Sequence, residues 1–267
     1  MRNLSRALTP LACALAMLVG GAGAASAADR YVALGDSYSS GTGTGSYTLH
    51  SGCQRGTYAY PYLASRQRPN TDLVFVACSG ATTTSLMSSQ ISSVTADTRL
   101  VSITIGGNDA GFADVMIACV TLGCASAIAD ARTFIQTTLP SRLNTVYAAI
   151  KSRAPGARVA VLGYPRLFGS SGCLATTGIS ASERTQLNQM ADLLRDVIRD
   201  RALAHGFSFV DAIPVFASHP ICTSEWINGL NIIRPSESFH RRVAGARPLR
   251  ARSEERRVGK ECRSRWS

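Results

Sequence analysis

The fold is decided by the stretch Tyr31-Val32-Ala33-Leu34-Gly35-Asp36-Ser37-Tyr38-Ser39-Ser40-Gly41. A short apolar run ends abruptly in Gly-Asp-Ser, and small hydroxyl residues and a glycine follow it. This pattern predicts a buried strand whose carboxyl end carries one serine, Ser37, on a tight turn. Ligands bind at that edge of open α/β sheets, so Ser37 is a candidate functional residue. Gly, Asp and Ser are also common in ordinary turns, and the motif alone does not exclude one.

Further apolar runs rich in Val and Ile follow along the chain, at residues 73–77, 100–105, 159–162 and 208–213. Helix-compatible stretches separate most of these runs. Near-continuous apolar strands that alternate with helices predict an α/β fold, with a central parallel sheet of about five strands covered on both faces. No repeat or low-complexity linker interrupts residues 28–240, so we expect a single domain there.

Two helices can be placed from the sequence. The clearer one covers residues 181–205, because Ser180 and Glu183 match a capping box and Gly206 supplies a stop. Its apolar residues form one stripe, which predicts a helix that packs on the sheet. The second helix is expected over residues 138–153. Segments rich in Gly, Ser, Thr and Pro are expected to be loops, namely the 40s, the 50s and residues 214–236.

The first 27 residues have the parts of a secretory signal peptide. Arg2 and Arg6 form a basic start, residues 11–19 are apolar, and Ala25-Ser26-Ala27 fits a cleavage site. The apolar run is shorter than the roughly 20 residues that span a bilayer. We therefore expect cleavage before Ala28 and a secreted, extracellular protein with no stable membrane insertion.

Export changes how the cysteines are interpreted. Cys13 lies in the signal segment and Cys262 near the end, and an even number of cysteines in the body predicts disulfides in an oxidising compartment. Spacing alone does not choose among the roughly 15 possible pairings. We expect the sequential pattern, which is Cys53–Cys78, Cys119–Cys124 and Cys173–Cys222. A metal site is disfavoured, because Cys119-x4-Cys124 has no second close pair and no flanking histidine.

The net charge of +11 is concentrated at the two ends of the chain. Arg2 and Arg6 contribute +2 and residues 241–267 contribute +7, which leaves only +2 for residues 28–240. A nucleic-acid-binding domain needs a basic face on its folded body, so we expect no nucleic-acid partner.

Residues 241–267 form an atypical basic tail without a helical or strand-like apolar period. One interpretation is a solvated basic arm that binds anionic surfaces. The other is a frameshifted, non-native end that has no place in the fold. We favour the second interpretation.

Four short segments carry the candidate chemistry, and the first three follow predicted strands. They are Gly35-Asp36-Ser37, Cys78-Ser79-Gly80-Ala81-Thr82, Ile105-Gly106-Gly107-Asn108-Asp109 and Ser236-Glu237-Ser238-Phe239-His240. A doubly wound parallel sheet brings the carboxyl ends of its strands to one edge, so the first three can share a pocket.

The residue types in these segments complement one another chemically. The hydroxyl of Ser37 is a poor nucleophile until a base such as His240 takes its proton. The oxyanion formed by its attack on a carbonyl needs hydrogen-bond donors that are already in place. The backbone N–H groups of Ser37 and Gly80 and the side-chain amide of Asn108 can supply three such donors.

This set of residues resembles the SGNH (GDSL) hydrolase superfamily, and more narrowly its secreted actinomycete-type lipases and esterases. The matching motifs are Ala-Leu-Gly-Asp-Ser-Tyr-Ser-Ser-Gly, Ala-Cys-Ser-Gly-Ala, Ile-Gly-Gly-Asn-Asp-Ala-Gly-Phe and Trp226-Ile227-Asn228-Gly229-Leu230. Three disulfides within the domain fit that group as well. The resemblance covers residues 29–240. It implies a flavodoxin-like three-layer α/β/α sandwich and hydrolysis of carboxylic esters through an acyl-serine, without metal or cofactor.

The segment around His240 departs from the pattern of the superfamily in two ways. The superfamily usually has Asp-x-x-His, whereas Glu237 stands three residues before His240. Either the Glu237 carboxylate or a backbone carbonyl can orient the imidazole, and we favour the carbonyl of Ser238. The short closing helix that normally follows the histidine is also poorly matched from Arg241 onward, which would leave His240 less well anchored.

The other histidines are weaker candidates. His50 and His205 are expected to be exposed, and His219 is a rival base.

Lipid-like esters are the substrate that the resemblance implies, while esters of acetylated polysaccharides and aryl esters remain alternatives. No lid-like amphipathic helix stands out, which favours accessible esters. A non-catalytic binding protein is a further alternative if the altered end displaces His240. We expect a monomer.

Overall fold

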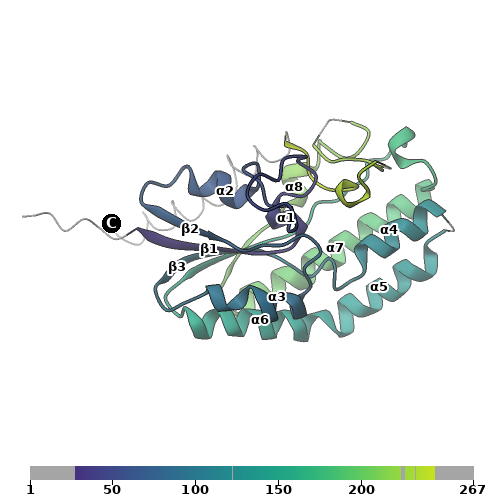
Figure 1. Ribbon diagram of the computed structural model, residues 1–267. Helices are drawn as coiled ribbons and strands as arrows, with labels where there is room; N and C mark the ends of the chain where they lie inside the picture. Colours follow the sequence, from purple (N-terminus) through teal and green to yellow (C-terminus); the bar gives the residue numbers. More distant parts are fainter. Residues whose placement is uncertain (1–27, 122, 224–225, 232, 244–267) are drawn as a thin grey trace, which may run out of the picture.

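Five parallel strands form the central sheet of the computed structural model, in the order β2-β1-β3-β4-β5 (Figure 1). The structure describes residues 28–121, 123–223, 226–231 and 233–243. The expected signal peptide with Cys13, and the basic tail from residue 244 with Cys262, lie outside them. The strands are β1 (Asp29–Gly35), β2 (Thr71–Phe75), β3 (Thr98–Thr104), β4 (Arg158–Leu162) and β5 (Ser208–Val210).

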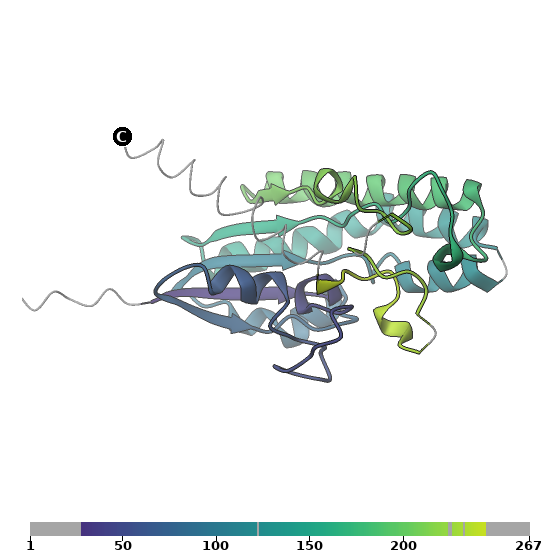
Figure 2. The same ribbon diagram turned by 90° about the horizontal axis from the view of Figure 1, so that it is seen from above.

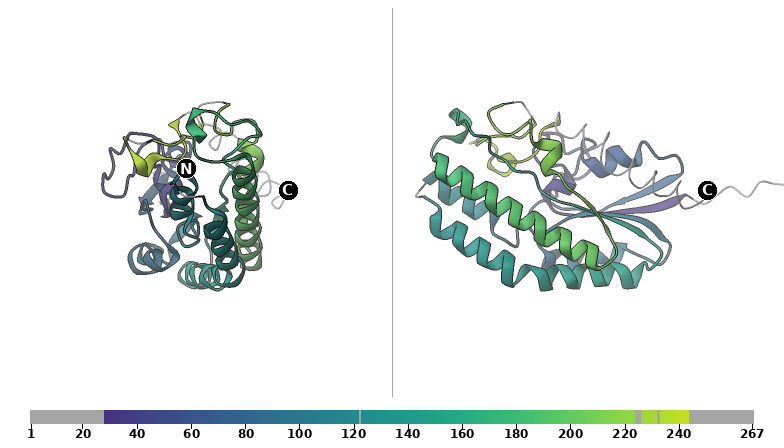
Figure 3. Two further views of the ribbon diagram at one scale, coloured as in Figure 1. Left: turned by 90° about the vertical axis from the view of Figure 1, so that its right-hand side faces the viewer. Right: turned by 180° about the vertical axis from the view of Figure 1, so that it is seen from behind.

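Helices cover both faces of the sheet and make the three layers expected from the sequence (Figures 1 and 2). The thinner layer holds the short helices α2 and α8, and the thicker layer holds α3 to α7, with α7 running along its length (Figure 3). The helices are α1 (Ser37–Ser40), α2 (Tyr60–Ser65), α3 (Thr83–Ser89), α4 (Phe112–Thr121), α5 (Ala125–Thr137), α6 (Leu139–Arg153), α7 (Ala181–Ala204) and α8 (Ile213–Phe216). Three short 3-10 turns complete the described elements, η1 (Ile91–Ser93), η2 (Leu174–Thr176) and η3 (Pro235–Glu237).

The strand side chains divide between two unequal cores, because successive residues of a strand point to opposite faces. Val32 and Leu34 belong to the large core on the thicker side. Tyr31 and Ala33 pack in a small cluster with Leu100 and with the half-buried Ala64 of α2. Burial on both faces explains why β1 is almost continuously apolar in sequence.

The strand order brings the site segments together. In an open sheet with this order, the crevice for ligands opens between β1 and β3. After β1 the chain adds β2 on one side of it, and then crosses to add β3, β4 and β5 on the other side. Ser37 follows β1 and Asn108 follows β3, so both lie at that crevice.

The predicted strands and the two predicted helices are confirmed, with shifts at their ends. The fifth strand stops at Val210 rather than at residue 213, because Asp211 accepts a hydrogen bond from the backbone N–H of Ile213 (2.9 Å) and starts the turn into α8. The 24-residue helix α7 begins at the capping box of Ser180 and Glu183. Among the described residues, no helix has the length and apolar character needed to cross a bilayer.

The structure has the disulfides Cys53–Cys78, Cys119–Cys124 and Cys173–Cys222, which are the sequential pairs expected from the sequence.

Candidate active site

Ser37 is the first residue of α1, directly after the carboxyl end of β1. Asp36 caps this helix by accepting a hydrogen bond from the N–H of Tyr38 (2.9 Å). Gly35 has φ +124°, and a Cβ there would overlap the carbonyl oxygen of Thr104 on the neighbouring strand. Glycine at 35 therefore allows the sharp turn that presents the Ser37 hydroxyl at the sheet edge.

His240 contacts Ser37 directly, although the two residues are far apart in the chain. Its Nε2 lies 2.7 Å from Ser37 Oγ, and its Nδ1 lies 2.8 Å from the carbonyl oxygen of Ser238. A carbonyl only accepts, so Nδ1 carries the proton and Nε2 is left to accept from the serine hydroxyl. Burial lowers the pKa of His240 to about 4, which keeps the imidazole neutral at physiological pH.

Glu237 is engaged elsewhere. Its Oε1 accepts hydrogen bonds from the hydroxyl of Tyr47 (2.7 Å) and from Nη1 of Arg234 (3.2 Å). Nδ1 of His240 is therefore paired with the backbone carbonyl of Ser238, while the Glu237 carboxylate has other partners.

Backbone hydrogen bonds anchor the segment that carries His240. The carbonyl of Phe239 accepts from the hydroxyl of Tyr38 (2.9 Å), and the carbonyl of His240 accepts from the N–H of Asn228 (2.8 Å). Arg242 then donates its N–H to the carbonyl of Trp226 (2.8 Å). These pairings anchor His240, and the stretch where the closing helix was expected to be poorly matched continues beyond the described residues after Val243.

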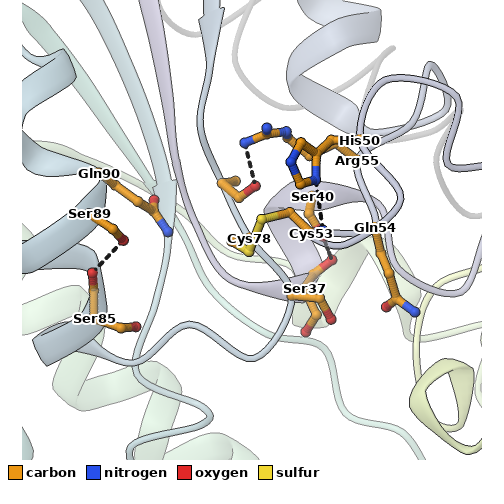
Figure 4. The surroundings of a disulfide bond; sticks show 12 residues. Ser37, Ser40, His50, Cys53, Gln54, Arg55, Cys78, Ser85, Ser89 and Gln90 are labelled. Carbon is orange, nitrogen blue, oxygen red and sulfur yellow. Dashed lines mark hydrogen bonds between the residues drawn. A yellow bond between two sulfur atoms is a disulfide. The ribbon is translucent and has the colours of Figure 1, made fainter.

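Gly80 lies in the turn between β2 and α3 and lines the same pocket as Ser37. Its φ of +80° is in the left-handed region that favours glycine. The disulfide Cys53–Cys78 lies beside α1, close to Ser37 (Figure 4), and the N–H of Ser79 donates to the carbonyl of Cys53 (3.0 Å). The crosslink thus ties the turn of Gly80 to the loop that follows α1.

Asn108 lines the same pocket, on the loop that follows β3. Its side-chain amide donates to the carbonyl of Ala81 (2.9 Å), next to Gly80. The neighbouring Asp109 accepts from the N–H of Thr83 (2.8 Å) and lies 3.3 Å from Arg142. Asp109 therefore holds the Asn108 loop against the start of α3.

Tyr164 is a site residue that the sequence interpretation missed. Its hydroxyl donates a hydrogen bond to the carboxyl of Asp36 and accepts one from the N–H of Gly107 (3.0 Å). Burial raises the pKa of Asp36 to about 7. Its place in the sequence could have identified Tyr164 as a candidate, since it stands two residues after β4, at the same edge of the sheet as Ser37.

A pocket of about 450 Å³ opens in front of Ser37 and His240. One of its walls is α4, which contributes Phe112, Met116, Ile117 and Val120, with Leu230 also lining the pocket. The sequence interpretation left α4 unassigned, so this apolar wall was not foreseen.

The remaining histidines lie outside this pocket. His219 stacks on Trp226, with ring centroids 3.4 Å apart, and His50 is exposed as expected. The expectation for His205 is wrong, because its ring packs against Tyr147 and Phe207 and burial lowers its pKa. Within the part of the chain that the structure describes, no cluster of three or more His, Cys, Asp or Glu side chains could hold a metal ion.

Comparison with known proteins gives consistent matches. Residues 33–245 match the GDSL-like Lipase/Acylhydrolase family. The chain is 47% identical over 226 residues to Lipase 1 of Streptomyces coelicolor, covering 82% of this chain and 83% of that protein. It resembles the crystal structure of the extracellular lipase of Streptomyces rimosus (46% identity, TM-score 0.78, 82% and 95% of the two chains). It also resembles that of phospholipase A1 of Streptomyces albidoflavus NA297 (43% identity, TM-score 0.79, 83% and 96%). The chain therefore belongs to the GDSL-like Lipase/Acylhydrolase family.

Proposed function

We propose that Ser37 is the nucleophile of this carboxylic ester hydrolase and that His240 is its general base. Ser37 Oγ attacks the ester carbonyl carbon while its proton passes to His240 Nε2. The resulting imidazolium is stabilised by the hydrogen bond from Nδ1 to the Ser238 carbonyl. Collapse of the tetrahedral intermediate breaks the ester bond, and the alcohol leaves with the proton from Nε2.

Water completes the reaction. It attacks the acyl-serine, His240 takes one proton from it, and the acid is released as Ser37 regains its hydrogen. In both steps the oxyanion is bound by the N–H groups of Ser37 and Gly80 and by the amide of Asn108. The acyl group extends along the apolar wall of α4, which supports lipid-like esters as substrates over acetylated polysaccharides.

The observation that carries this proposal is the pair of short contacts at His240, 2.7 Å to Ser37 Oγ and 2.8 Å to the Ser238 carbonyl. The experiment compares Ser37→Ala with Ser89→Ala, an exposed serine on α3, using soluble p-nitrophenyl esters and labelling by an organophosphonate. Ser37→Ala is expected to abolish both hydrolysis and labelling, and Ser89→Ala to leave both unchanged. Full activity in Ser37→Ala would overturn the assignment.

The same contacts count against a non-catalytic binding protein, because His240 is in reach of the serine hydroxyl. A series of p-nitrophenyl esters from acetate to palmitate tests the acyl preference. The highest kcat/KM is expected for chains long enough to lie along α4, and a clear preference for acetate would favour the polysaccharide alternative.

We further propose a secreted protein with a signal peptide at residues 1–27 and a hydrolase domain that begins at residue 28. The boundary expected at residue 240 is moved, because Arg241 is buried, Arg242 bonds to Trp226 and the family match runs to residue 245. We therefore place the non-native tail beyond residue 245. The three disulfides and the extracellular location of the Streptomyces rimosus lipase support secretion. The mass of the protein secreted by its natural host tests the cleavage site and the tail together.

A further inference from the structure

Four large aliphatic side chains are exposed on segments that line the active-site pocket or lie next to such segments. They are Ile117 at the outer side of α4, Leu174 on η2, and Leu230 and Ile233 in the loop before His240. Leu174 is 90% exposed and Ile233 is 89% exposed. We refer to these four residues as the rim patch.

Two members of the rim patch belong to the pocket, since Ile117 and Leu230 both line it in front of Ser37. The N–H of Leu230 donates to the carbonyl of Ala175 (3.3 Å), which places the turn of Leu174 beside Leu230. Ile233 stands in the chain between Leu230 and Pro235, which both line the pocket. The turn η2 and residues 226–240 lie at the same end of the molecule (Figures 1 and 2).

The backbone at the two most exposed positions is held in place. Asn231 Oδ1 accepts hydrogen bonds from the N–H groups of Ile233 (3.1 Å) and Arg234 (2.9 Å). Leu174 follows Cys173, whose disulfide to Cys222 fixes the start of η2. Both side chains are therefore presented to solvent by ordered turns.

An ester bound in the pocket cannot account for this exposure. Leu174 and Ile233 are not among the residues that line the pocket, so a single substrate molecule leaves both of them in water. Exposed apolar patches beside a pocket mark contact with a protein or with a lipid surface. A folded protein seated there would block the path by which an ester reaches Ser37, whereas a lipid phase supplies the substrate.

We propose that the rim patch docks the protein on the surface of aggregated ester lipid, from which one acyl chain enters the pocket along α4. This inference rests on the proposed function and deepens it. Apolar side chains at the rim enter the boundary between headgroups and acyl chains, and the free energy of that transfer holds the enzyme at the surface.

The test uses the double variant Leu174→Ser/Ile233→Ser, which spares the pocket-lining Ile117 and Leu230. The matched control is Leu49→Ser/Leu203→Ser, which removes two exposed leucines, 45% and 56% exposed, away from the pocket. Vesicles of zwitterionic phosphatidylcholine serve as the probe, so that the positive charge of the chain does not drive binding. Binding is measured by co-sedimentation in a Ser37→Ala background, and hydrolysis is measured on the same vesicles and on soluble p-nitrophenyl butyrate.

Compared with the control variant, Leu174→Ser/Ile233→Ser (the rim variant) is expected to bind the vesicles at least about tenfold more weakly. It should hydrolyse vesicle lipid correspondingly more slowly. Its rate on the soluble ester stays within about twofold of the control. If the rim variant binds vesicles as tightly as the control, the proposal that the rim patch docks on lipid is wrong, while the proposed function stays intact. Loss of a dimer in the rim variant, seen by light scattering with unchanged vesicle binding, would also overturn it. Absence of soluble-ester hydrolysis in the unmodified chain would instead contradict the proposed function.

Discussion

The hydroxyl of Tyr164 donates a hydrogen bond to the buried carboxyl of Asp36, the residue that immediately precedes Ser37. The same hydroxyl accepts from the N–H of Gly107, the residue before Asn108. One phenol oxygen therefore joins the turn that carries Ser37 to the loop that carries Asn108. The distance between the proposed nucleophile and the proposed oxyanion donor thus depends on the side chain of Tyr164.

Replacing Tyr164 by Phe is expected to lower kcat about ten- to a hundredfold with little change in KM, because misplacement of oxyanion donors affects the transition state more than substrate binding. The free energy of unfolding should also fall by about 1–3 kcal/mol, since the carboxyl of Asp36 loses its partner. Steady-state kinetics on a soluble ester and urea unfolding measure the two effects.

Tyr147→Phe is the matched control. Tyr147 is fully buried, and among the described residues its hydroxyl has no hydrogen-bond partner. Its removal should leave kcat unchanged and the stability equal or slightly higher. Equal losses of kcat in the two variants would contradict a specific role for Tyr164.

The pKa of His240 predicts activity far into the acid range. Burial lowers this pKa to about 4, so the imidazole stays neutral and able to accept the serine proton until the pH falls through that value. The profile of kcat/KM between pH 3.5 and 6 should reach half its plateau near pH 4. Asp36, whose pKa burial raises to about 7, stays protonated throughout that window. A midpoint near the ordinary histidine value of about 6.5 would contradict the prediction.

Glu237→Gln is expected to leave kcat within about threefold of the unmodified enzyme, because Nδ1 of His240 is bonded to the Ser238 carbonyl. The amide can still accept from Tyr47, so the loop should keep its fold. A loss of about 10⁴-fold, the scale for removal of a triad aspartate, would show that the carboxylate orients the base. The readout is kcat on a soluble ester.

Asn108→Ala is expected to lower kcat about 100- to 1,000-fold, the usual effect of losing one oxyanion donor. The bond from Asn108 to the Ala81 carbonyl is lost, but the fold should persist because Asp109 still ties the loop to Thr83 and Arg142. Far-ultraviolet circular dichroism and thermal unfolding check the fold. A loss smaller than about tenfold would remove Asn108 from the proposed oxyanion site.

Arg241→Met is expected to stabilise the protein. Arg241 is 2% exposed; its Nη2 donates to the carbonyl of Tyr38 (2.9 Å), while its Nε and Nη1 have no partner in the described part of the chain. Burial lowers its pKa to about 10, so the group remains charged at pH 7. Replacing this buried charge by an apolar side chain should add about 1 kcal/mol or more to the free energy of unfolding.

Thermal unfolding measures this gain as a rise in Tm of about 2–4 °C for a domain of this size. The exposed Arg66 offers the control, since Arg66→Met should change stability by no more than about 0.5 kcal/mol. A lower Tm for Arg241→Met would show that the hydrogen bond to Tyr38 outweighs the cost of burial.

Helix α4 shows why part of the site could not be predicted from sequence. Its residues, Phe112–Thr121, are mostly apolar with β-branched members, and such a short run is compatible with either a strand or a buried helix. Only the packing of α4 beside α5 makes it a wall of the pocket. The apolar wall that supports the proposed acyl preference was therefore not visible in the sequence.

Local sequence by itself determined the strands, the helix of residues 181–204 and the four segments that carry Ser37, Gly80, Asn108 and His240. Each of these follows from apolar periodicity, a cap, or a turn that needs glycine, and all three act over a few residues. Tertiary structure alone decided that Glu237 bonds to Tyr47 rather than to His240, that Tyr164 joins two turns of the site, and that Ile117 and Leu230 line the pocket. The physical reason is separation in the chain, because the contacts of Glu237 with Tyr47 and of Tyr164 with Asp36 join residues 190 and 128 positions apart and leave no periodic trace in the sequence.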